Sequence, residues 1–350
     1  MIPHDDQVVG EYPLPIPPFF DPGRASEIWK VPYQERADEA KLWARDHDLQ
    51  PSYKDKLKIA LILIDMQNTF CIPGFELFVG GRSGTGAVDD VVRIAKFIYH
   101  NLNSITQISL TLDTHKAMQI FHQGFLVNEE GVHPPPFTLI SYTDIASGRW
   151  MFNRDIASSL GIDPELGQRY LMEYTKQLEV DQKYNLTIWP YHAMLGGIGH
   201  ALVPTVEEAI FFHTIARSSQ PTFLIKGDSA ISESYSAIGP EVLTDPNGDL
   251  ISEKSDRILH QIVEFDAVVF AGEAKSHCVS WTIDDLLHQI NAHDPDLTKK
   301  VYLLEDCSTP VVVPDVMDYT EIADKAYQYY DEACMHIVQS TDPITKWPGL

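Results

Sequence analysis

Three side chains of the types that perform acyl transfer each follow an apolar run of the sequence. Asp65 ends ALILID, Lys226 follows TFLI, and Cys278 lies in AGEAKSHCVSWTIDDLL, where an apolar run turns into a helix. A helix N-terminus and a nearby cation favour the thiolate, and a neighbouring carboxylate can act as general base. We therefore predict Cys278 as nucleophile, Asp65 as acid–base group, Lys226 as stabilising cation, and the backbone N–H groups of Ala274 and Cys278 as oxyanion hole.

Each of these residues also has an ordinary structural role. A lone cysteine beside a strand is usually a small core residue, a lysine after a strand is often a turn residue, and an aspartate there often caps a helix. The catalytic interpretation therefore depends on the three side chains meeting in the fold.

A second group of residues has the types that bind a divalent metal ion. The segment TLDTHKAMQIFH contains Asp113, His115 and His122, and the segment WPYH contains His192. Carboxylate and imidazole together suit zinc, with iron and manganese as alternatives. We predict a metal site made by Asp113, His115 and His192. His122, seven residues after His115, is the weaker candidate ligand.

The elements that must position these residues alternate between two patterns. Short apolar, β-branched runs typical of strands alternate with stretches of helical periodicity, as in βαβ units. This predicts an α/β fold of three αβα layers around a mostly parallel six-stranded sheet. The predicted strands are 59–64, 105–112, 185–189, 222–225, 267–272 and 300–305, and the predicted helices between them are 87–102, 201–218, 252–263, 279–292 and 319–338.

The candidate residues all follow predicted strands. In an open parallel sheet the carboxyl ends of the strands share one edge, and ligands bind at that edge. Five of the six predicted strands therefore deliver reactive or metal-binding side chains to one place.

Two segments lie outside this alternation. Residues 1–55 are rich in proline and aromatic residues, with a predicted helix from Tyr33 to His47, and form an N-terminal extension that we expect to pack on the core or on a neighbouring subunit. Residues 56–350 form the catalytic domain, which carries an insertion at about 123–184 with a predicted helix at 164–180.

Composition limits the partners of the protein. The 350 residues include 26 Lys and Arg against 50 Asp and Glu, which gives a net charge of −24 and disfavours nucleic acids and anionic membranes. No apolar stretch of about 18 residues is present. The four cysteines have no paired spacing, which is typical of a reducing compartment. We expect a cytoplasmic protein acting on a small molecule.

The motifs, in this order, resemble those of the isochorismatase-like cysteine hydrolases and, among them, the nicotinamidases. The similar segments are ILIDMQNTF, DTH, WPYH, KGDSAISESYSAI and GEAKSHCV. The resemblance implies a metal-containing amidohydrolase, often oligomeric, that cleaves a small amide, nicotinamide first among the candidates, through a thioester. It implies that Phe70 and Trp189 flank the substrate ring, that Tyr235 contributes to the substrate site, and that Glu273–Ala274 is a cis peptide.

The sequence also departs from this pattern and leaves alternatives open. Ala193 stands after WPYH where nicotinamidases commonly have cysteine, and compact nicotinamidases lack the N-terminal extension and the insertion. A metal-independent hydrolase of the same fold, acting on an enol-pyruvyl ether or a ureido amide, is one alternative, and an inactive binding homologue is another. A dinucleotide-binding oxidoreductase is disfavoured because no G-x-G-x-x-G follows the first strand.

Overall fold

A single parallel sheet forms the centre of the protein. The computed structural model describes residues 13–181 and 183–350. Its six-stranded sheet has the order β12-β9-β8-β1-β2-β7, and every neighbouring pair is parallel. The α/β fold class is therefore confirmed. The strands are β1 (Ile59–Ile64), β2 (Ile105–Asp113), β7 (Thr222–Lys226), β8 (Ala267–Gly272), β9 (Val301–Leu304) and β12 (His336–Val338).

The central strands are buried on both faces. β1 and β8 read IALILI and AVVFAG, and all their residues are buried, as expected for parallel strands covered by helices on both sides. Alternate residues of β1 belong to two separate cores, with Leu61 in one and Ile62 in the other.

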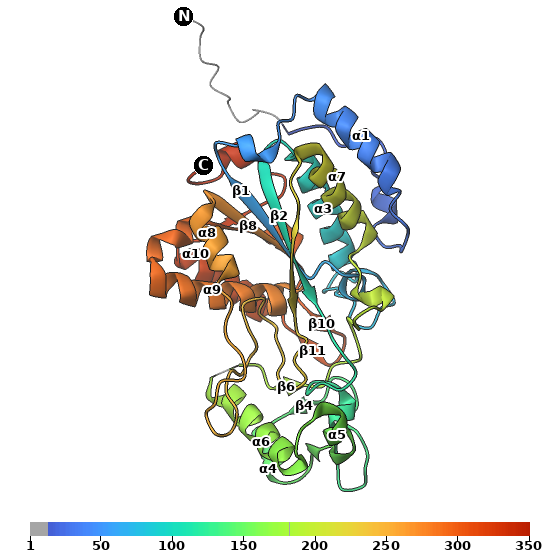
Figure 1. The fold of residues 1–350 in the computed structure, drawn as a ribbon, viewed down its shortest axis with the longest axis vertical. Helices are drawn as coiled ribbons and strands as arrows, with labels where there is room; N and C mark the ends of the chain where they lie inside the picture. Colours follow the sequence, from blue (N-terminus) through green and yellow to red (C-terminus); the bar gives the residue numbers. More distant parts are fainter. Residues whose placement is uncertain (1–12, 182) are drawn as a thin grey trace, which may run out of the picture.

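Helices cover both faces of this sheet (Figure 1). One layer contains α3 (Gly86–His100) and α7 (Pro204–Arg217), which pack in the same core as Leu61. The other contains α8 (Arg257–Glu264), α9 (Ser280–His293) and α10 (Thr320–Glu332). The predicted three-layer arrangement is thus observed. Among the described residues, none of the helices is both long enough and apolar enough to cross a membrane.

Two predicted elements differ from those observed. The run 185–189 is not part of the central sheet: it contains only β6 (Leu186–Thr187), which pairs antiparallel with β4 (Leu139–Ile140) because the insertion provides the core that buries this run. The sixth strand of the sheet is instead β12, inside the predicted helix 319–338. That helix ends early because Cys334 adopts a left-handed conformation with φ of 69°.

The insertion has its own hydrophobic core at one end of the molecule, opposite α1 in Figure 1. The helix predicted at 164–180 is observed as α6. The remaining elements of the insertion are short: β3 (Leu126–Val127), α4 (Tyr142–Ala146), β5 (Met151–Phe152) and α5 (Ala157–Leu160). Elsewhere in the chain, α2 (Asn68–Cys71) follows β1, and β10 (Val312–Val313) and β11 (Met317–Asp318) form a hairpin after β9.

The N-terminal segment from residue 13 onward packs on the outer helices. Its helix α1 (Tyr33–Asp46) matches the helix predicted from Tyr33 to His47. Arg36 of α1 donates a 2.6 Å hydrogen bond to Glu208 of α7, and both side chains are buried.

Candidate active site

Lys226 lies at the centre of a buried cluster of reactive groups. Its Nζ atom is 3.0 Å from Asp65 Oδ2, 3.0 Å from Asp113 Oδ1 and 3.4 Å from Cys278 Sγ. It also donates a 3.0 Å hydrogen bond to the carbonyl oxygen of Ser234. The structure therefore brings together the three residues predicted for acyl transfer, and it joins them to Asp113, a predicted metal ligand.

The ends of β1 and β2 hold the two carboxylates in place. Asp65 has φ of 46°, its N–H donates to Thr111 Oγ1 at 3.0 Å, and its Oδ1 accepts a 2.5 Å hydrogen bond from that hydroxyl. Gln67 clamps the main chain of Asp113, donating to its carbonyl oxygen and accepting from its N–H at 2.8 and 2.7 Å. Sequence reasoning missed Thr111 and Gln67, although both lie within two residues of a predicted site residue.

Cys278 lies in a tight turn between β8 and α9. Residues Lys275–Val279 form one π-helical turn, and the peptide bond Glu273–Ala274 is cis, as the resemblance implied. Ala274 and Cys278 both line the cavity described below. This geometry is compatible with the predicted oxyanion hole.

Electrostatics decides which of these groups carries a proton. Burial raises the pKa of Cys278 well above its usual range, although Lys226 opposes the rise, so the turn by itself does not produce a thiolate. Burial also raises the pKa of Asp65 against the effect of Lys226. Burial alone would lower the pKa of Lys226, but Asp113 and Asp65 outweigh it and raise that pKa. The protonated thiol must therefore lose its proton to a base before it can act as a nucleophile. Asp65 is the candidate base, because it contacts the same Lys226 ammonium group as Cys278 does.

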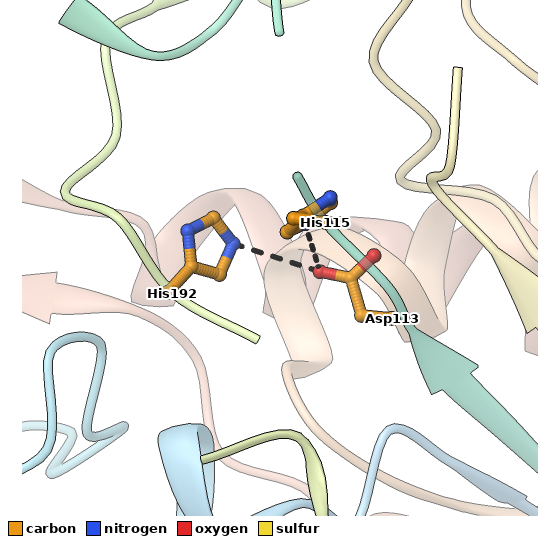
Figure 2. A group of neighbouring side chains, drawn as sticks. All are labelled: Asp113, His115 and His192. Carbon is orange, nitrogen blue, oxygen red and sulfur yellow. Dashed lines mark hydrogen bonds and ion pairs between the residues drawn. The ribbon is translucent and has the colours of Figure 1, made fainter. Parts of the chain in front are cut away.

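The three predicted metal ligands converge on one carboxylate oxygen. Figure 2 shows the rings of His115 and His192 directed at Asp113 Oδ2, with Nε2 atoms 2.7 and 3.6 Å from it. The Nδ1 atoms of these rings lie 3.0 Å from the carbonyl oxygen of Gly227 and 2.8 Å from that of Pro190. The candidate ligand atoms all lie within 4.8 Å of one another.

These contacts fit a bound cation. A carbonyl oxygen only accepts hydrogen bonds, so each imidazole carries its N–H at Nδ1, and the Nε2 lone pair faces the carboxylate. A lone pair and a carboxylate oxygen repel one another at this range unless positive charge lies between them, as a proton or a metal ion. Anchoring of the second ring nitrogen by a carbonyl is also the usual arrangement of metal-binding histidines.

His122 lies beside this group rather than within it. Its ring centroid is 5.8 Å from that of His115 and 5.9 Å from that of His192. Its Nδ1 is 3.1 Å from the carbonyl oxygen of Lys116, and its buried Nε2 has no hydrogen-bond partner among the described residues. Burial, with the two neighbouring histidines, lowers the pKa of His122 to about 3. It is neutral and adjacent to the three candidate ligands.

A cavity of about 350 Å³ opens above the cluster. Most of the predicted site residues line it, namely Phe70, Asp113, Trp189, His192, Lys226, Tyr235, Ala274 and Cys278. Asp65 and His115 are not in the lining and lie behind it. Trp189 donates a 3.0 Å hydrogen bond from Nε1 to the Tyr235 hydroxyl, which fixes the indole plane in the wall.

Two buried titratable residues of the lining were not predicted. Burial raises the pKa of Glu233 to about 7, and burial lowers the pKa of His277 to about 3. His277 directly precedes the nucleophile in sequence, and its ring centroid is 5.8 Å from that of Trp189. Its position next to Cys278 is the signal that could have identified it.

Comparisons with known proteins gave three-dimensional similarities only. No family model matches the chain, and no curated protein matches it. The chain is similar to a nicotinamidase and pyrazinamidase of Acinetobacter baumanii, with 19% identity over 83% of this chain and 99% of that one and a TM-score of 0.47. It is similar to a yeast nicotinamidase bound to nicotinaldehyde, with 19% identity over 80% of this chain and 99% of that one and a TM-score of 0.49. It is also similar to an N-carbamoylsarcosine amidase of Thermoplasma acidophilum, with 16% identity over 82% of this chain and 99% of that one and a TM-score of 0.40.

Proposed function

We propose that this chain is a cysteine amidohydrolase that hydrolyses a small aromatic carboxamide through a thioester, with nicotinamide, cleaved to nicotinate and ammonia, as the first candidate. The observation that carries the proposal is the contact of Lys226 Nζ with both Asp65 and Cys278, at 3.0 and 3.4 Å, on the floor of an aromatic cavity. The motif resemblance supports the same chemistry.

The proposed reaction begins with the protonated thiol. Asp65 accepts the proton of Cys278 while Lys226 stabilises the thiolate, and the sulfur attacks the amide carbon. The N–H groups of Ala274 and Cys278 donate to the resulting oxyanion. As the C–N bond breaks, Asp65 returns the proton to the departing nitrogen, and ammonia leaves. Asp65 then deprotonates a water molecule that attacks the thioester, which releases the carboxylic acid and restores the thiol.

Aromatic side chains orient the ring of the substrate in this proposal. Phe70 and Trp189 are both buried and line the cavity. Their flat faces favour a planar ring, and holding that ring fixes the amide carbon near the sulfur, which lowers the entropic part of the barrier. The hydrogen bond from Trp189 to Tyr235 keeps one wall in place.

Asp113, His115 and His192 are the residues that would hold a divalent metal ion, with zinc as the expected ion. When bound there, the ion supplies a Lewis acid that can hold the ring nitrogen of a pyridine carboxamide. Asp113 also pairs with Lys226, so one carboxylate positions both the metal site and the catalytic cation.

An ammonia-release assay with nicotinamide, pyrazinamide and several ureido amides tests the proposal. We expect turnover of the aromatic amides, and a loss of at least about 1000-fold in kcat/KM for Cys278→Ala, because among the described residues Cys278 is the one cysteine that lines the cavity. Cys334→Ser is the matched control, since Cys334 is exposed and outside the cavity lining. Near-normal activity of Cys278→Ala would refute the mechanism, and ammonia from ureido amides alone would favour the alternative hydrolase.

A further inference from the structure

The cavity has two parts that differ in burial and in chemistry. The buried residues of the lining include Cys278, Lys226 and most of its ionisable groups. Another set of lining residues is half-buried and apolar. We call this second part the outer wall and define it as Phe75, Leu77, Phe137, Val312 and Val313.

We propose that the outer wall is a second subsite, which binds a neutral apolar substituent on the ring of the aromatic carboxamide. The inference rests on the proposed amidohydrolase activity and names its substrate class. The preferred substrate is an alkyl- or aryl-substituted ring carboxamide rather than the bare pyridine.

The size of the cavity supports this assignment. A cavity of about 150 Å³ is enough for one benzene ring, whereas this one measures about 350 Å³. A bare pyridine carboxamide between Phe70 and Trp189 therefore leaves a large part of the apolar surface in contact with water. An apolar group that covers the outer wall removes that surface from water, which favours binding.

The charge of the outer wall selects the kind of substituent. None of its five residues is charged. The lining acid adjacent to the outer wall in sequence is Glu76, which is exposed and accepts a 3.2 Å hydrogen bond from Thr69. A carboxylate or phosphate on the ring would find no cation there and would meet a protein of net charge −24. The outer wall therefore favours alkyl and aryl groups.

The insertion contributes directly to the outer wall through Phe137. This residue has φ of 66°, a conformation that is rare for residues other than glycine. It is held by a 2.5 Å hydrogen bond from its N–H to the carbonyl oxygen of Ile188. Its ring packs edge-on against Trp189, with centroids 6.1 Å apart and an interplanar angle of 89°. Phe137 thus extends the ring-binding wall outward from the predicted substrate residues.

The substituent must lie on the acyl side of the amide. Asp65, which protonates the leaving nitrogen in the proposed mechanism, is fully buried and lies behind the lining. A nitrogen that takes its proton from Asp65 therefore leaves from the buried end of the cavity, which favours a small leaving group such as ammonia. The extra volume of the cavity is therefore available to the ring and not to the amide nitrogen.

Steady-state kinetics with ring-substituted nicotinamides tests the subsite. The series is nicotinamide, its 5-propyl and 6-propyl derivatives, and 5-carboxynicotinamide as an anionic comparison. Each buried methylene is worth about fourfold in kcat/KM, so three fully buried carbons give about sixtyfold. Because the outer wall is only half-buried, we expect about half of the corresponding free energy. This gives about an eightfold increase in kcat/KM, mainly through a lower KM, for the better propyl derivative. The carboxy derivative should be poorer than nicotinamide.

Two variants of the hairpin between β10 and β11 form a matched pair. Val313→Asp places a charge in the outer wall and should reduce the ratio of propyl to unsubstituted kcat/KM to about one or below. Val316→Asp is the control, because Val316 belongs to the same hairpin, is 58% exposed and is absent from the lining, so the ratio should persist.

The outcomes separate the subsite from the proposed function. If nicotinamide is hydrolysed but neither propyl derivative is better, or if both hairpin variants change the ratio equally, the outer subsite is wrong and the amidase stands. If no amide is hydrolysed, calorimetry on the Cys278→Ala variant measures the binding of each compound directly. A propyl derivative that binds no more tightly than nicotinamide overturns the subsite. Tighter binding of the propyl derivative that is lost when Val313→Asp is added supports it.

Discussion

Replacing Lys226 by methionine removes a buried cation that contacts both Asp65 and Asp113. Methionine keeps a long apolar chain but has no charge, and the side chains of the two aspartates are 0% and 5% exposed. The Lys226→Met variant therefore leaves two buried carboxylates without the cation that compensates them. We expect a large loss of stability in addition to a loss of activity.

The size of the loss follows from the burial of the partners. Removing one member of a buried ion pair costs about 3–5 kcal/mol. Unfolding entropy of about 2.1 cal/mol/K per residue gives roughly 0.7 kcal/mol/K for a chain of this length. The melting temperature of Lys226→Met should therefore fall by about 4–7 °C.

Lys275→Met is the matched control for this measurement. Lys275 is also buried, at 7% side-chain exposure, but its partners Asp324 and Glu305 are 54% and 44% exposed and remain solvated when the cation is removed. Such pairs contribute about 0–1 kcal/mol. Urea and thermal unfolding of the two variants should differ by at least about 2 kcal/mol.

The pH dependence of the loss has a definite sign. Lys226 lowers the pKa of both Asp65 and Asp113, so its removal raises both pKa values in the folded state. A carboxyl group whose pKa is higher in the folded than in the unfolded state destabilises the fold at high pH, and protonation relieves this cost as the pH falls. The deficit of Lys226→Met should thus be greater at pH 8 than at pH 5. Equal losses in the two variants at pH 8, or a deficit that grows at pH 5, would refute the reasoning.

Three further predictions concern the neighbours of these groups. Thr111→Val removes a hydrogen bond that lowers the pKa of Asp65, so the acid limb of the kcat/KM profile should move to higher pH, and an unchanged or lower limb would contradict Asp65 as the base. His192→Ala should weaken metal binding by more than about 100-fold, measured as metal content after dialysis, and a metal-free wild type supplied with zinc would contradict the site. Gly227→Ala should abolish activity and lower the melting temperature, since φ is 79° and a Cβ would lie 2.7 Å from Asp113 Oδ1; wild-type ammonia release would contradict this.

The sequence by itself determined the fold class and the meeting of the reactive residues. Long apolar runs such as 59–64 and 267–272 can only be buried between two layers, and parallel strands bring their carboxyl ends to one edge. Asp65 and Cys278 follow such runs, and Lys226 follows the shorter apolar run TFLI, which forms a largely exposed edge strand of the same sheet, so their convergence could be predicted without coordinates. The candidate metal ligands Asp113 and His115 were found by the same argument.

Only the tertiary structure decided which segments join the sheet and what surrounds the site. The run 185–189 has the composition of a sheet strand, but the core of the insertion buries it elsewhere, whereas β12 takes the edge position after an early helix end. The protonated state of Cys278 and the outer wall near Phe137 likewise depend on groups that are distant in sequence. Burial and Coulomb interactions depend on three-dimensional surroundings, which local sequence patterns do not record.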